Sequence, residues 1–171
     1  MSDFDWLAQG VGILASAIVI FSFSQKSDNR FKVFLIAGAF AFAFHYILMG
    51  ALAAAFVAVV NGIRSFCSIK FHGSDKIMIA FILFYISSIF FVYERPYDLL
   101  PVFSGVLSTF ALYKLQGIKM RVSFFFAESS WLVFSILINS IGGIITNVFV
   151  LATNSITTYR LVRDSKNETH R

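Results

Sequence analysis

The chain has 171 residues, of which 58 % are hydrophobic, 13 % are charged and 22 are phenylalanine. Soluble domains carry about 45–50 % apolar and about 25 % charged residues, so this composition excludes an ordinary water-soluble enzyme. The net charge of +5 suits a basic membrane face and requires no nucleic-acid partner.

Seven apolar runs follow one another, each of about the length that crosses a hydrocarbon layer of about 30 Å as a helix. They are Trp6–Ser24, Phe31–Met49, Ala51–Ile69, Ile77–Tyr93, Leu99–Gln116, Val122–Ile138 and Ile141–Tyr159. No cleavable signal peptide is expected, because Asp3 and Asp5 stand where a signal peptide carries positive charge. The sequence predicts an all-α membrane protein with seven transmembrane helices, forming a single transmembrane domain over residues 1–171.

Two of the apolar blocks are too long for one crossing. The block Phe31 to Ile69 must turn back at Gly50, and the block from Val122 to Arg160 must turn within Asn139–Gly143. Residues 37–46 alternate small and aromatic side chains, a pattern that also suits a strand. A membrane barrel needs polar residues between the apolar ones, and here both sets are apolar, so a helix is predicted.

The basic residues divide unequally between the two predicted membrane faces. Thirteen of the fourteen Lys and Arg fall on one face, and only Arg95 falls on the other. The positive-inside rule then places the N-terminus outside and the C-terminus in the cytoplasm. The polar tail, residues 161–171, is expected to be cytoplasmic and disordered, and the basic face is expected to contact anionic lipid headgroups.

An internal repeat appears when the chain is shifted against itself by 93 residues. The aligned pairs include Gly12 with Gly105, Ser16 with Thr109, Phe31 with Phe124, Gly50 with Gly143, and Asn61 with Asn154. Repeat one spans residues 6–69, a linker helix spans residues 77–93, and repeat two spans residues 99–160. A shift of this length crosses the membrane four times, so the two repeats are parallel, as in SWEET-type transporters.

The 3+1+3 arrangement, with an Asn in the third and seventh helices, resembles the SWEET and PQ-loop superfamily. Within it the chain resembles the YgjV family of bacterial inner-membrane proteins. The segments that carry the resemblance are "WLAQGVG" (Trp6–Gly12), "DNRFK" (Asp28–Lys32), "FHYILMGA" (Phe44–Ala51), "NGIRS" (Asn61–Ser65), "DLLPV" (Asp98–Val102), "STFAL" (Ser108–Leu112), "MR" (Met120-Arg121) and "SIGG" (Ser140–Gly143). The Pro-Gln pair of PQ-loop proteins is missing. The resemblance implies a multi-pass protein of the bacterial cytoplasmic membrane and, more distantly, a transporter.

Polar groups inside hydrocarbon need a partner or water, which makes them candidates for function. Counting residues from the outer end places Asn61 and Asn154 at the midplane, with Ser16 and Thr109 at a similar depth. Their amides and hydroxyls supply donors and acceptors without charge, as a solute site between repeats requires. The alternative is that each Asn only bonds a neighbouring helix.

Three further residues are candidates for a polar, proton or solute site. Glu128 is expected about 10 Å inside the sixth helix, where it can bind solute, carry a proton, or pair with His45 or Lys114. His45 either serves such a site or donates a hydrogen bond across a helix interface. Trp131 either stacks on a sugar ring or base, or packs in the interior. A stripe of small residues, Ala51-Ala55-Ala58-Gly62, predicts close helix packing.

The sequence carries no phosphate-binding Gly-Lys-Ser/Thr loop, no Cys/His cluster for a metal and no Gly-x-Ser-x-Gly nucleophile, so neither an enzyme nor a cofactor is expected. The favoured function is a transporter or facilitator of a small polar, sugar-like solute, by alternating access of the two repeats. The alternative is a non-transporting sensor or scaffold that docks a protein or anionic lipid on the basic cytoplasmic face. The oligomeric state is left open.

Overall fold

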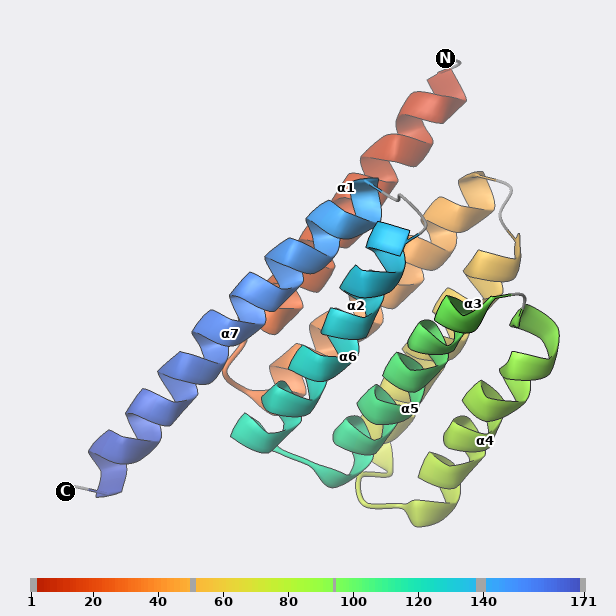
Figure 1. Ribbon diagram of the computed structural model, residues 1–171. Helices are drawn as coiled ribbons and strands as arrows, with labels where there is room; N and C mark the ends of the chain where they lie inside the picture. The colour runs from red at the N-terminus through yellow and green to blue at the C-terminus, as the bar shows by residue number, and fades with distance from the viewer. Residues whose placement is uncertain (1–2, 50–51, 94, 138–140, 170–171) are drawn as a thin grey trace. The chain divides into compact units, whose positions relative to one another are not determined.

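The computed structural model describes residues 3–49, 52–93, 95–137 and 141–169, and these residues form seven α-helices and one short 3₁₀ helix (Figure 1). The elements are α1 (Asp3–Phe23), α2 (Asp28–Leu48), α3 (Leu52–Lys70), α4 (Asp75–Val92), η1 (Pro96–Asp98), α5 (Leu99–Lys114), α6 (Gly117–Leu137) and α7 (Ile141–Thr169). Each α-helix overlaps one predicted apolar run, so the all-α fold is confirmed for the described residues. Residues 37–46 lie inside α2, which excludes the strand alternative.

Three of the described helices are long and apolar enough to cross a membrane. They are the segments Trp6–Phe23, Asp28–Leu48 and Gly117–Leu137. In hydrocarbon every backbone donor and acceptor must bond within the protein, which is why such apolar runs become helices. The crossings predicted for the other four runs stay predictions.

The chain divides into two compact units, Met1–Lys70 and Phe71–Arg171. Unit 1 holds α1, α2 and α3, and α2 packs against both of the others. In unit 2, α4 packs against α5, and α6 packs against both α5 and α7. The second helix of each predicted repeat therefore contacts the first and the third. The boundary falls after α3, which leaves repeat one whole and groups the linker helix with repeat two.

Small residues set the helix spacing within unit 1. Ala55 and Ala58 are buried, and Gly62 lies so close to Phe40 that an added Cβ would sit 3.0 Å from a ring carbon. The packing predicted for this stripe is confirmed for these residues, whereas Ala51 lies outside the described residues. Gly38 likewise faces Val19, where an added Cβ would lie 2.5 Å from a methyl carbon.

Unit 2 is centred on α5. This helix buries eight of its residues: Val102, Ser104, Gly105, Ser108, Thr109, Ala111, Leu112 and Tyr113. Gly105 lies directly against the ring of Tyr85 on α4, in the space that a side chain would occupy. The far end of α5 is tied to the turn before α4, because Gly73 N donates to Tyr113 O at 2.9 Å and Lys114 Nζ pairs with Asp75 at 2.6 Å.

The C-terminal segment differs from its prediction. Residues 161–169 continue α7 as a helix of 29 residues, about 44 Å long by the rise of an α-helix. No Gly or Pro follows Gly143, and the Leu, Arg and Lys residues of this segment favour helix. The prediction of a disordered tail is therefore wrong over 161–169. Gly142 and Gly143 lie in the first turn of α7, whereas the predicted turn residues Gly50 and Asn139-Ser140 lie outside the described residues.

Candidate functional site

Asn154 on α7 is fully buried and bound to α6. Its Nδ2 donates to the carbonyl oxygen of Arg121 at 2.9 Å, and its own carbonyl accepts the Thr158 hydroxyl at 2.8 Å. Arg121 lies in the second turn of α6, close to the first residue, Gly117. The contact places Asn154 nearer to the start of α6 than to its middle, and its depth in the membrane stays a prediction.

A second contact fixes the register between α6 and α7. Near the other end of α6, Ser135 Oγ accepts a hydrogen bond from Asn147 Nδ2 at 3.2 Å. Early residues of α7 thus meet late residues of α6, and Asn154, later in α7, meets Arg121, early in α6. The two helices are antiparallel, and Asn147 and Asn154 mark two levels of the same interface.

Two buried polar atoms of α7 lie close together at the Asn154 level. Within the described part of the chain, Asn154 Oδ1 and Thr157 Oγ1 have no hydrogen-bond partner, and both residues are almost wholly inaccessible. Residues three apart share a helix face, so both atoms belong to one patch. An unsatisfied buried acceptor or hydroxyl costs about 1–3 kcal/mol, which a bound polar solute or an ordered water recovers.

Arg121 completes this patch and is the functional candidate that sequence reasoning missed. The charge count of the sequence assigns Arg121 to a membrane face, whereas its side chain is fully buried in α6. A helical side chain leans toward the N-terminus of its helix, and in this antiparallel pair that direction leads from Asn154 toward Thr157. The patch of Arg121, Asn154 and Thr157, called the α6–α7 polar patch below, therefore combines a guanidinium, an amide and a hydroxyl.

The corresponding part of unit 1 is built differently. Asn61 is half-buried on α3, and its carbonyl accepts the Ser65 hydroxyl at 2.9 Å, as that of Asn154 accepts Thr158. The predicted 93-residue shift also pairs Ser65 with Thr158, so this intrahelical hydrogen bond occurs at aligned positions. That Asn61 and Asn154 face each other stays a prediction.

Unit 1 also buries two cations that the charge count had placed on the membrane face. Lys32 on α2 donates to the Ser68 carbonyl on α3 at 3.4 Å, and Arg64 lies one turn from Ser68 on the same face. Lys32 lies in the second turn of α2, because the helix begins at Asp28 with Ser27 at its N-cap, before the start of the predicted run.

The two predicted hydroxyls differ in burial. Thr109 is fully buried and donates its hydroxyl proton to the Gly105 carbonyl at 2.6 Å. Its aligned partner Ser16 is half-buried on α1. Thr109 lies on α5 and Asn154 on α7, and both helices pack against α6.

His45 joins two helices of unit 1. Its Nδ1 lies 2.8 Å from the Ala8 carbonyl oxygen, and its ring fills the space beside Gly12, where an added Cβ would lie 2.8 Å from Cε1. This geometry, with Nδ1 as the donor, is the helix-interface alternative for His45.

Glu128 lies on α6, which begins at Gly117, before the predicted run, and its depth in the membrane stays a prediction. It is half-buried and about 16 Å along the helix, near the middle. Lys114, one predicted partner, pairs with Asp75. Trp131 is 36 % exposed and packs edge-on against Phe134 at 5.8 Å between ring centroids, so it is not a core residue.

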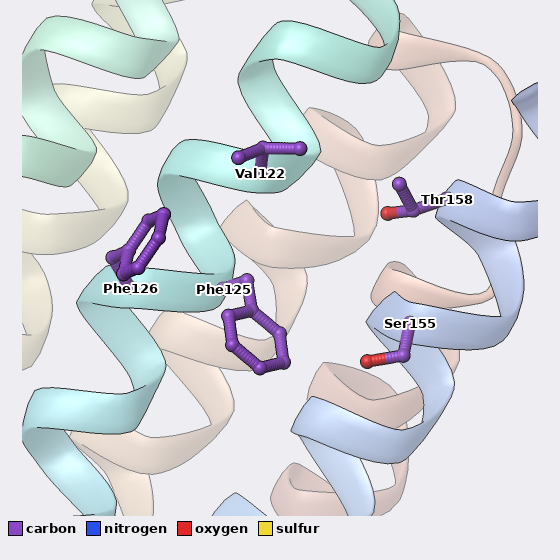
Figure 2. A pocket seen from close by; sticks show the side chains of 5 residues that line it. All are labelled: Val122, Phe125, Phe126, Ser155 and Thr158. Atoms are coloured by element: carbon purple, nitrogen blue, oxygen red, sulfur yellow. The ribbon is translucent and has the colours of Figure 1, made fainter.

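A separate groove lies on the exposed face of the same helix pair (Figure 2). Val122, Phe125 and Phe126 of α6 and Ser155 and Thr158 of α7 enclose about 280 Å³. The Ser155 hydroxyl donates to Leu151 O at 2.8 Å and the Thr158 hydroxyl to Asn154 O, so both protons are used within α7. We refer to these five residues as the α6–α7 groove.

Comparison with known proteins agrees with the membrane character of the fold. Residues 6–165 match the Imp-YgjV family, described as bacterial inner membrane protein. The chain is also 31 % identical over 161 residues to the inner membrane protein YgjV of Escherichia coli (strain K12), covering 94 % of this chain and 87 % of that protein. No solved structure matches the chain.

Proposed function

We propose that this chain, which belongs to the YgjV family of bacterial inner membrane proteins, is a transporter or facilitator of a small polar solute. The family establishes a multi-pass protein of the inner membrane. The proposal adds two parallel three-helix repeats joined by α4, an outer N-terminus and a cytoplasmic C-terminus. Alternating access of the two repeats would then expose a polar site first to one side and then to the other.

The α6–α7 polar patch carries the proposal. A polar or charged group inside a membrane domain costs free energy. Such groups are usually retained because they line a substrate path. Asn154 Oδ1 accepts and Thr157 Oγ1 donates, which suits a hydroxyl-bearing solute such as a sugar. The buried guanidinium of Arg121 extends the range to solutes that also carry an acceptor or an anionic group.

Uptake into proteoliposomes tests the proposal. The purified protein is assayed against sugars, amino acids and nucleosides, with protein-free liposomes as the blank. Thr157→Val keeps the side-chain shape and removes only the hydroxyl. The substitution Thr157→Val should reduce uptake, whereas Asn147→Leu, about three turns away on α7, should not. Equal uptake by all three proteins would remove the patch from the substrate path.

A second function, a sensor or scaffold at the cytoplasmic face, is favoured by the length of α7. The helix continues through Arg160, Arg163 and Lys166, and this basic stretch projects beyond the apolar part of the helix. Ending the chain after Leu161 separates the two functions. Transport should survive the truncation, whereas a docking role should be lost with the basic stretch.

A further inference from the structure

The α6–α7 groove is apolar in the part that faces outward. Phe126 is 57 % exposed, Val122 and Phe125 are also exposed, and all three lie within the candidate membrane span Gly117–Leu137. The two hydroxyls that line the groove already donate to backbone carbonyls. The groove therefore offers hydrocarbon contact and no spare donor, which suits an alkyl chain better than a polar solute (Figure 2).

One end of the groove is basic. Lys119 is exposed one turn before Val122, and residues three apart lie on the same side of a helix. On α7 the groove face continues from Ser155 through Tyr159 and Val162 to Lys166, at spacings of four, three and four residues.

The antiparallel register places the start of α6, with Lys119, and the basic end of α7, with Lys166, at the same end of the groove. Asn154 bonds to Arg121, so residues before Arg121 on α6 lie beside residues after Asn154 on α7. Lys119 and Tyr159 therefore flank the same end of the groove, and Tyr159 is 67 % exposed there. A cation and a phenol beside an apolar surface are typical of the interface between headgroups and hydrocarbon.

We propose that the α6–α7 groove is a binding site for an anionic phospholipid. One acyl chain lies along Val122, Phe125 and Phe126, and the phosphate group lies at Lys119, with Lys166 further out on the headgroup side. The volume of about 280 Å³ is just below the range of about 300–1,000 Å³ typical of small-molecule pockets, so it holds part of one chain rather than a whole ligand. The site is independent of the polar patch on the buried side of α7.

The test measures which lipids stay on the purified protein in detergent. Native mass spectrometry counts the bound molecules after addition of phosphatidylglycerol or phosphatidylcholine with identical acyl chains. The unchanged protein should retain phosphatidylglycerol about fivefold better, the factor expected from one Lys near an anionic headgroup. Equal retention of the two lipids would overturn the anionic assignment.

Two variants separate the chain from the headgroup. Ser155→Leu fills the groove and should abolish retention of both lipids, whereas Ser87→Leu, at an exposed Ser with a similar intrahelical bond on α4, should not. Lys119→Gln should remove the preference for phosphatidylglycerol, and Lys76→Gln, at an exposed Lys of α4, should keep it.

Two outcomes overturn the site. If Ser155→Leu retains lipid as well as Ser87→Leu does, the chain does not occupy the groove. If Ser155→Leu instead converts a dimer of the unchanged protein to a monomer, the groove is an interface with a second copy. Thermal unfolding of each variant in the same detergent, expected within a few degrees of the unchanged protein, separates lost binding from lost folding.

Discussion

The helices α3 and α7 are aligned by the predicted internal repeat, yet they differ in which polar side chains they bury. Both place an Asn whose carbonyl accepts a hydroxyl one turn on, but Asn154 is fully buried and Asn61 is half-buried. Three residues after the Asn, α3 carries the buried cation Arg64 where α7 carries Thr157. In unit 2 the buried cation comes from α6 instead, as Arg121. The aligned asparagines thus share this local hydrogen bond, whereas the buried cations stand at positions that the predicted repeat does not pair.

The largest effect expected concerns the parallel orientation of the two repeats, because it is all or none. A reporter that fluoresces only in the cytoplasm should be bright when fused after Arg171, since thirteen of fourteen basic residues lie on that predicted face. A reporter at Met1 should be dark. A stable, dark fusion at the C-terminus would contradict the parallel orientation of the repeats. It would mean an even number of crossings, whereas two parallel three-helix repeats joined by one linker helix need seven.

The next effect compares the glycines aligned at the start of each repeat. Gly105→Ala should destabilise the protein by about 1–3 kcal/mol, because the new Cβ meets the buried ring of Tyr85 on α4. Gly12→Ala should cost less, since it meets only the edge of the His45 ring. Thermal unfolding in detergent measures both.

Gly10→Ala is the matched control for these two substitutions. Its Cβ would meet nothing within 4 Å, so helix propensity alone predicts a gain of up to about 1 kcal/mol. Equal losses at all three glycines would show that the close contacts of Gly12 and Gly105 do not govern stability.

A smaller effect should separate the two asparagines. Asn154→Leu removes the bond to the Arg121 carbonyl and should cost about 1–2 kcal/mol, the scale of interhelical hydrogen bonds in membranes. Asn61→Leu should cost less, because Asn61 is only half-buried. The midpoints of thermal unfolding give the order, and the reverse order would contradict the greater structural role of Asn154.

The smallest effect is expected at Glu128, whose aligned residue in repeat one is Leu35. Glu128→Gln keeps size and hydrogen bonding but removes the titrating group. Once a solute is known, uptake with and without a proton gradient should be the same for the variant and the unchanged protein. Loss of gradient dependence in a folded variant would instead assign Glu128 to proton coupling.

The number and limits of the helices could be predicted from the sequence. All seven α-helices of the described residues begin within five residues of the predicted runs, and the stripe containing Ala55, Ala58 and Gly62 packs as expected. This succeeds because helix formation in hydrocarbon is a local requirement: each backbone group bonds within its own segment. The exception is the end of α7, where polarity was taken as disorder although nothing in residues 161–169 interrupts a helix.

The candidate site was only partly predictable. Asn154 and Thr109 are polar residues in predicted apolar runs and are buried, whereas the charge count did not predict the burial of Lys32, Arg64 and Arg121 within the protein. Counting residues from one helix end could not reveal that Asn154 bonds to the Arg121 carbonyl, because that contact is set by the register of α7 against α6.

The sequence by itself therefore determined the helices and the family, because hydropathy and residue identity are properties of segments. Only the tertiary structure decided which polar atoms are buried, that Asn154 bonds to the Arg121 carbonyl, and that five residues of α6 and α7 line a groove. These features depend on how two helices, each with its own backbone hydrogen bonds, pack side by side. A side chain's surroundings in such an interface come from its neighbour's register, which no single segment encodes.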